Sequence, residues 1–240
     1  MQEITNLAGG AIIGFGLAWM LERWLIIFVR RLSVAEPKDF SQENDENFSK
    51  FYSHWGIYIG MTITAAALNE WRQWSPELLN DLILITALVG IAWIDRKTLL
   101  IEGRLIALAM GVRLLWLSFF APQEMLNSLT SLLIGAGILY FIGFLYETFR
   151  HSQGLGEGDA AVLGLIGLWV GWQGLGTVLL IAALSGIIIG GISLLRQRKV
   201  NQNIPDLLQT QIPFAPFLCL GGLIIYFLQE TGFIMRGFGF

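Results

Sequence analysis

Apolar residues form eight long stretches along this chain, and short polar segments separate them. A transmembrane helix needs about 20 mostly apolar residues to cross the hydrocarbon core of a bilayer. The pattern therefore predicts an all-α polytopic membrane protein with about eight transmembrane helices. Because the second, sixth and eighth stretches are short, a six-span chain with two re-entrant segments is the structural alternative. The eight ranges are roughly 5–29, 54–69, 78–95, 104–121, 126–146, 159–173, 175–195 and 212–228.

The composition agrees with a membrane protein and excludes several other classes. Of the 240 residues, 55% are hydrophobic and 14% are charged, whereas soluble domains carry about 25% charged residues. The net charge of −3 and the absence of a clustered basic stripe argue against nucleic acid as a partner. The single cysteine, Cys219, excludes an intramolecular disulfide and a multi-cysteine metal site. The first residues lack a basic segment, so the first stretch is expected to be a retained span.

The positive charges predict the orientation, because cytoplasmic loops of membrane proteins are enriched in Lys and Arg. With the N-terminus on the periplasmic side, the outer segments hold only Arg72 and Arg236. The inner loops then hold eleven of the 15 basic residues: Arg30, Arg31, Lys38, Lys50, Arg96, Lys97, Arg104, Arg150, Arg196, Arg198 and Lys199.

Residues 1–240 are expected to form a single membrane domain. The longest polar segment, about 30–53, is mixed in charge and poor in aliphatic residues, so it reads as a cytoplasmic loop without a core of its own. Two glycine pairs are spaced four residues apart within apolar stretches, which predicts close helix packing there. These pairs are Gly10 with Gly14 and Gly186 with Gly190.

Ionisable residues inside or beside an apolar stretch are candidates for function, because burying a charge in a membrane is costly. Asp81 lies near the outer end of the third stretch and is expected to reach water. The candidates are Glu22, Arg23, Asp95, Arg113 and Asp159.

Two of these acids are expected at the same membrane boundary. Asp95 ends the third stretch and Asp159 opens the sixth, so in the predicted orientation both lie on the cytoplasmic side. Two carboxylates that meet at low dielectric cannot both ionise easily and share a proton. Such a pair can activate a water molecule with one member and protonate a carbonyl oxygen with the other, as in aspartic proteases. The alternative is that each aspartate only caps a helix end.

The residues before Asp159 favour the catalytic interpretation. They read Gly154-Leu155-Gly156-Glu157-Gly158-Asp159, with three alternating glycines. Glycine permits positive φ and leaves no side chain to hold another backbone away. A protease that cleaves a helical substrate must unwind it and lay it beside the acid. We therefore expect Gly156, Glu157 and Gly158 to form an active-site loop.

Three blocks of this sequence resemble the type IV prepilin peptidases, which are membrane aspartyl proteases with a GxGD motif. Gly156-Glu157-Gly158-Asp159 is similar to that motif, and Ile94-Asp95 followed by Thr98-Leu99-Leu100 resembles the first-aspartate segment. The third block, Ile212-Pro213-Phe214-Ala215-Pro216-Phe217-Leu218, resembles the IPFxPFL block that begins the last helix of the family. Within that block, Pro213, Phe214 and Pro216 are expected to support the active site from the start of the last helix. The resemblance covers about residues 80–228, the expected peptidase-like core.

The resemblance implies an endopeptidase of the bacterial inner membrane, with Asp95 and Asp159 as catalytic residues at the cytoplasmic side. The implied partners are the lipid bilayer and the substrates, which are prepilins or type II secretion pseudopilins. Their short basic leader ends in a glycine, and cleavage falls after it. Neither a cofactor nor a metal is implied for proteolysis. S-adenosylmethionine is implied only if the chain also methylates the new N-terminus, as many family members do.

The chain departs from the family pattern in three places. Ile101-Glu102-Gly103 stands where a proline with Asp or Asn usually follows the first aspartate, and Ala161 replaces the usual lysine. The paired-cysteine cytoplasmic domain of longer members is absent. One alternative is therefore a catalytically weak relative that acts as an assembly factor. Another is a carboxylate-based transporter, which predicts acids near the bilayer midplane and an internal repeat.

Overall fold

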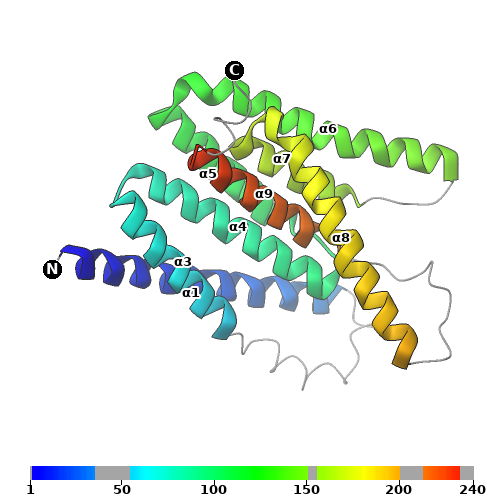
Figure 1. Ribbon diagram of the computed structural model, residues 1–240, viewed down its shortest axis with the longest axis horizontal. Helices are drawn as coiled ribbons and strands as arrows, with labels where there is room; N and C mark the ends of the chain where they lie inside the picture. The colour runs from blue at the N-terminus through cyan, green and yellow to red at the C-terminus, as the bar shows by residue number, and fades with distance from the viewer. Residues whose placement is uncertain (1, 36–54, 151–155, 201–212, 233–240) are drawn as a thin grey trace. The chain divides into compact units, whose positions relative to one another are not determined.

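The structure, a computed structural model, describes residues 2–35, 55–150, 156–200 and 213–232. Within these ranges every regular element is a helix (Figure 1). Each of the eight predicted apolar stretches corresponds to one α-helix, so the prediction of an all-α protein is confirmed. The elements are α1 (Gln2–Ala35), α3 (Trp55–Arg72), α4 (Pro76–Thr98), α5 (Gly103–Phe120), the 3-10 helix η1 (Pro122–Glu124), α6 (Met125–Arg150), α7 (Glu157–Val170), α8 (Trp172–Val200) and α9 (Ala215–Glu230).

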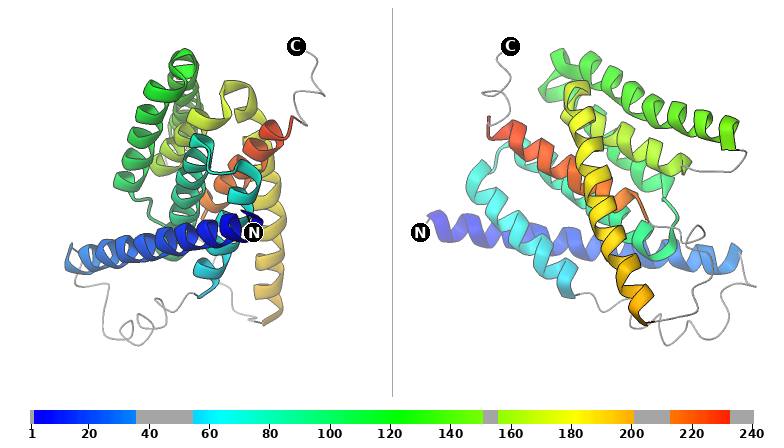
Figure 2. Two further views of the ribbon diagram at one scale, coloured as in Figure 1. Left: turned by 90° about the vertical axis from the view of Figure 1, so that its left-hand side faces the viewer. Right: turned by 45° about the vertical axis from the view of Figure 1, so that its right-hand side comes forward.

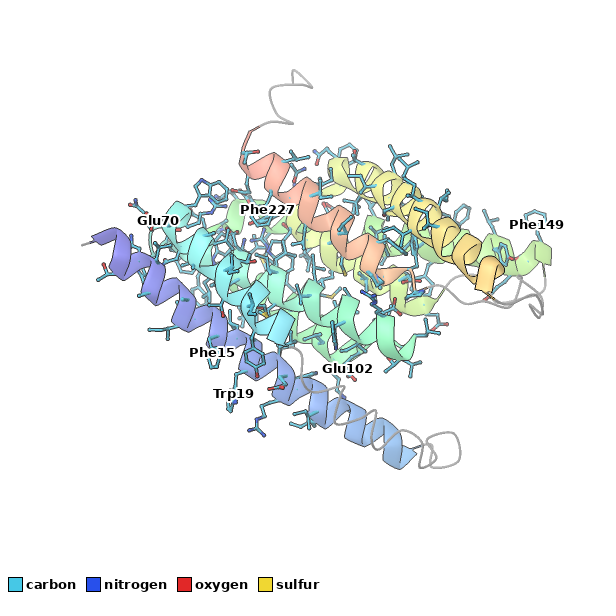
Figure 3. All side chains as sticks on the ribbon, turned by 60° about the horizontal axis from the view of Figure 1, so that its bottom comes forward. Phe15, Trp19, Glu70, Glu102, Phe149 and Phe227 are labelled. Carbon is cyan, nitrogen blue, oxygen red and sulfur yellow. The ribbon has the colours of Figure 1, made fainter. Side chains whose placement is uncertain are left out.

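Several of these helices are suited to a bilayer. Many large apolar side chains on α6 and α8 are exposed, as expected for surfaces that lipid covers, and Figure 3 shows Phe149 at the far end of α6. The number of spans and the periplasmic N-terminus stay predictions. In the described part of the chain, four segments are long and apolar enough to cross a membrane: Pro76–Arg96, Gly103–Phe120, Pro122–Phe149 and Trp172–Ile192.

The chain forms two compact units, Met1–Thr86 and Ala87–Phe240, and the division falls inside α4. The single membrane domain predicted for residues 1–240 stays a prediction. The predicted loop 30–53 begins too early, because residues 30–35 continue α1; the rest of that loop lies outside the described residues.

In the first unit, α3 crosses α1 at a pair of glycines (Figures 1 and 2). A Cβ atom on Gly10 would lie 2.7 Å from the carbonyl oxygen of Ala65, and one on Gly14 would lie 2.6 Å from that of Met61. The close packing predicted for this pair is therefore confirmed. Gly186, by contrast, is in ordinary van der Waals contact with the Phe217 ring.

The expectation that Asp81 reaches water is wrong. Asp81 is fully buried, and its Oδ2 atom accepts a hydrogen bond from Nε of Arg72 at 2.9 Å. The turn between α3 and α4 brings the arginine back to the carboxylate through Gln73 and Trp74, both of which have positive φ. The ion pair provides the partner that a buried carboxylate requires.

In the second unit, α7 lies against α5, α6, α8 and α9 (Figure 2). Eleven of its 14 residues are buried, which is typical of an apolar helix inside a protein core. At 1.5 Å per residue it is about 21 Å long, shorter than the roughly 30 Å hydrocarbon core. It ends at Gly171, whose φ of 76° lets α8 begin at the next residue. The break between α7 and α8 therefore falls at Gly171, a few residues before the boundary that the apolar stretches predict near residue 174.

The contact between α6 and α7 tests whether glycine packing stabilises this unit. A Cβ atom on Gly135 would lie 2.7 Å from the Leu163 carbonyl oxygen, whereas one on Gly137 would meet nothing within 4 Å. We predict that Gly135→Ala destabilises the protein by about 1–3 kcal/mol, because the helices must separate. The matched change Gly137→Ala should be neutral or stabilising by up to about 1 kcal/mol. Thermal unfolding in detergent measures both, and equal midpoints would contradict the prediction.

Candidate active site

Asp95 lies near the C-terminal end of α4 and is bonded to the start of α9. Its side chain is buried, and Oδ2 accepts a hydrogen bond from the backbone N–H of Ala215 at 3.1 Å. The first N–H groups of a helix have no partner within that helix and carry partial positive charge. Phe214, at the N-cap, makes no side-chain capping bond. Asp95 therefore caps α9 from a different helix.

The predicted supporting block forms this helix start. Pro213 and Phe214 directly precede α9, and Pro216 is its second residue. Proline suits the first turn of a helix, because the N–H that it lacks would have no intrahelical acceptor there. The block therefore begins α9 at Ala215, beside Asp95.

Asp159 is the third residue of α7, and its side chain is buried. Its backbone N–H donates to the carbonyl oxygen of Gly156 at 3.0 Å, which closes the first turn. Gly156, at the N-cap, has a φ of −70° and Gly158 is helical, so the residues predicted to form an active-site loop instead begin α7, and neither glycine uses the positive φ that glycine permits. Glu157 is exposed in the same first turn, where an acid favours the helix dipole. Gly154 lies outside the described residues.

Gly158 allows a close approach, but the neighbour is a side chain of this chain and not the substrate backbone that the sequence predicted. A Cβ atom on Gly158 would lie 2.7 Å from Cβ and Cδ1 of Ile101, a residue in the connection between α4 and α5. That a substrate backbone passes the same glycines stays a prediction.

The structure brings the two predicted catalytic aspartates together. Asp95 from α4 and Asp159 from α7 lie close enough for their charges to interact. The buried thiol of Cys219, one turn into α9, lies within electrostatic range of both. Two carboxyl groups in such a place can hold one proton between them and act on a water molecule and a carbonyl group together.

Arg113, another sequence candidate, lies at the opposite end of α7. Its Nε atom donates to the Leu168 carbonyl oxygen at 3.3 Å, and its guanidinium group stacks over the rings of Trp116 and Trp169. A cation is favoured at a helix C-terminus. Arg113 therefore anchors the helix that bears Asp159.

In the first unit, Glu22 accepts a hydrogen bond from the Tyr58 hydroxyl group, and Arg23 lies over the Trp19 ring. Figure 3 labels Trp19 and Phe15 along α1, and the Phe15 ring packs at a tilt against that of Tyr58. Glu22 and Arg23, the remaining two candidates from the sequence, therefore contact residues of their own unit.

Three contributors to the site were missed by the sequence analysis: the N–H of Ala215, the side chain of Ile101 and Cys219. The paired prolines around Ala215 are a signal for a helix start, and a helix start offers free N–H groups. Neither the packing of Ile101 on Gly158 nor the position of Cys219 near the aspartates has a sequence signal.

Metal ligation has little support in the described ranges. There, no group of three or more His, Cys, Asp or Glu side chains is arranged to hold a metal ion. The expectation that proteolysis needs no metal stays a prediction.

Comparison with known proteins gives an independent view of the site. Residues 82–191 match the profile of the type IV leader peptidase family. This range contains both aspartates and the glycines before Asp159, and it ends before the Pro213 block.

Several curated relatives are named "Prepilin leader peptidase/N-methyltransferase". The Legionella pneumophila relative is 31% identical over 160 residues, which cover 65% of this chain and 52% of the relative. The Pectobacterium carotovorum subsp. carotovorum relative is 33% identical over 174 residues, covering 69% and 55%. The Escherichia coli (strain K12) relative is 28% identical over 176 residues, covering 73% and 75%.

The chain spans about half the length of the first two relatives. A comparison with solved structures finds no match. The profile match and the names of the relatives nonetheless agree with one another, and the matched range contains the first two of the three sequence blocks. Through residues 82–191, this chain is similar to the type IV leader peptidase family.

Proposed function

We propose that this chain is an aspartic endopeptidase that removes the short basic leader of prepilins or type II secretion pseudopilins. The observation that carries the proposal is the meeting of Asp95 and Asp159 from two helices, with their charges in range of each other. The family match over the same residues and the names of the relatives support it.

In the proposed reaction, both carboxyl groups act on the peptide bond. The ionised member takes a proton from water as the water oxygen attacks the carbonyl carbon, and the protonated member donates a proton to the carbonyl oxygen. When the tetrahedral intermediate collapses, the C–N bond breaks, the leaving nitrogen receives the proton taken from water, and a hydroxyl group of the intermediate returns its proton to the aspartate that had donated it. The roles of the two aspartates are left unassigned, because a coupled pair shares its titration.

The proposed location of the reaction is the cytoplasmic face of the bacterial inner membrane. The distribution of Lys and Arg supports this orientation. A substrate with a basic leader followed by an apolar helix would present its scissile bond at such a boundary. The partners proposed are accordingly the prepilin substrate and the lipid bilayer.

Methylation of the new N-terminus is a second part of the proposal, supported by the names of the relatives. The group transferred would come from S-adenosylmethionine. One experiment examines both activities: the purified chain is incubated with a prepilin with and without S-adenosylmethionine, and mass spectrometry identifies the new N-terminus. Intact prepilin would favour the assembly-factor alternative.

Both carboxylates are expected to be required for cleavage. Asp95→Asn and Asp159→Asn should each lower the rate of leader removal by at least about 100-fold, because each removes an acid–base group. Asn at position 95 keeps an oxygen that can accept the Ala215 N–H, so the variant should still fold. Glu147→Gln, which changes an exposed acid on α6, is the matched control. Normal cleavage by either Asn variant would contradict the proposed mechanism.

Another prediction concerns Gly158. Gly158→Ala should slow cleavage by roughly tenfold or more, because the new Cβ displaces Ile101 beside the dyad. In Gly103→Ala, at the first residue of α5, the new Cβ meets nothing within 4 Å, so this variant should leave the rate unchanged. The rates are compared at equal amounts of folded protein, and equal rates for both variants would sink the prediction.

A further inference from the structure

The connection between α4 and α5 joins the surroundings of the two aspartates. At one end, the N–H of Leu99 donates to the backbone carbonyl oxygen of Asp95 at 2.9 Å. At the other end, Ile101 fills the space beside Gly158, the residue before Asp159. Leu99 and Leu100 therefore directly precede Ile101 in a connection that is bonded to the Asp95 backbone at one end and packed against Gly158 at the other.

This connection is held in one conformation. Leu99 has a φ of 54°, which is unfavourable for a residue other than glycine. The Thr98 hydroxyl group donates to the Ile94 carbonyl oxygen at 2.9 Å and accepts the N–H of Leu100 at 3.2 Å. Backbone strain persists only where the surroundings impose it, and it is concentrated at functional sites.

Leu99 and Leu100 are exposed although both are large and apolar, with 45% and 49% of their surface accessible. Charged residues flank them on both sides. Arg96 is exposed before them, and after them Glu102 accepts the N–H of Arg104 at the start of α5 (Figure 3). Such charges indicate the polar boundary of a membrane rather than its hydrocarbon core, so lipid tails do not account for the exposed pair.

We propose that Leu99 and Leu100 are specificity-determining residues that contact a large apolar substrate side chain directly after the scissile bond. This inference rests on the proposed function. An unwound substrate segment lying beside Asp95 and Asp159 must pass this connection, and an apolar side chain would bury both leucines there. The basic leader lies on the other side of the scissile bond, so the apolar contact selects the first residue of the hydrophobic helix.

The test is a double-mutant cycle between enzyme and substrate. Two prepilins that differ only in the residue after the cleaved bond, Phe in one and Ala in the other, are cleaved by the full chain. The wild-type enzyme should prefer Phe by roughly tenfold or more in kcat/KM. The double variant Leu99→Asn/Leu100→Ala should lose most of this preference by cleaving the Phe substrate more slowly, with the Ala substrate little affected. Asn tolerates the left-handed backbone at position 99, so the turn is kept.

The matched control is Leu126→Ala, an exposed leucine on α6, which should keep the wild-type preference. An unchanged preference in the double variant overturns this inference while leaving the proposed function in place. An equal loss of rate for both substrates would reveal a structural role and would also overturn it. Failure of the wild-type chain to cleave either prepilin overturns the proposed function, and this inference with it.

Discussion

The hydrogen bond from the Ala215 N–H to Asp95 satisfies two groups that neither helix can satisfy alone. A buried carboxylate without a donor is costly, and the first N–H groups of a buried helix need an acceptor. α4 supplies the acceptor and α9 the donor. α9 in turn packs on α7, where a Cβ atom on Gly222 would lie 3.0 Å from Ile166. The bond to α9, together with the packing of α9 on α7, thus connects the first aspartate to the helix that carries the second.

The position of Asp159 depends on the opposite end of α7. A short helix inside a protein core cannot leave its last carbonyl groups to water, so they must find donors nearby. Donors come from the backbone of the next residue, from α5 and from α9. They are the Gly171 N–H to Gly167 at 3.0 Å, Arg113 to Leu168 at 3.3 Å and Gln229 to Val170 at 3.0 Å. Hydrogen bonds from neighbouring parts of the protein therefore fix the position of α7, and with it that of Asp159, within the second unit.

The sequence was sufficient to predict the helices and the pairing of Asp95 with Asp159. It was insufficient to predict the groups that bond to the buried acids. Long apolar runs leave little choice but helix, because backbone groups in lipid must bond internally. Asp81 was misplaced because its burial depends on Arg72, and the return of that arginine depends on two left-handed residues that no pattern marks. The donor to Asp95 is a backbone N–H, which no residue type encodes; only the flanking prolines indicate it.

At Ile101 the residue type departs from the family pattern, but the connection between α4 and α5 is not loosened by the change. A proline would fix φ at one position and remove one donor. Here the rigidity comes from the hydroxyl bonds of Thr98, the left-handed turn at Leu99 and the packing of Ile101 on Gly158. That packing requires a glycine in the GxGD motif. The segment after the first aspartate and the GxGD motif therefore constrain each other through this contact. The missing proline is therefore weak support for a catalytically weak relative, because the geometry that it would secure is maintained by other residues.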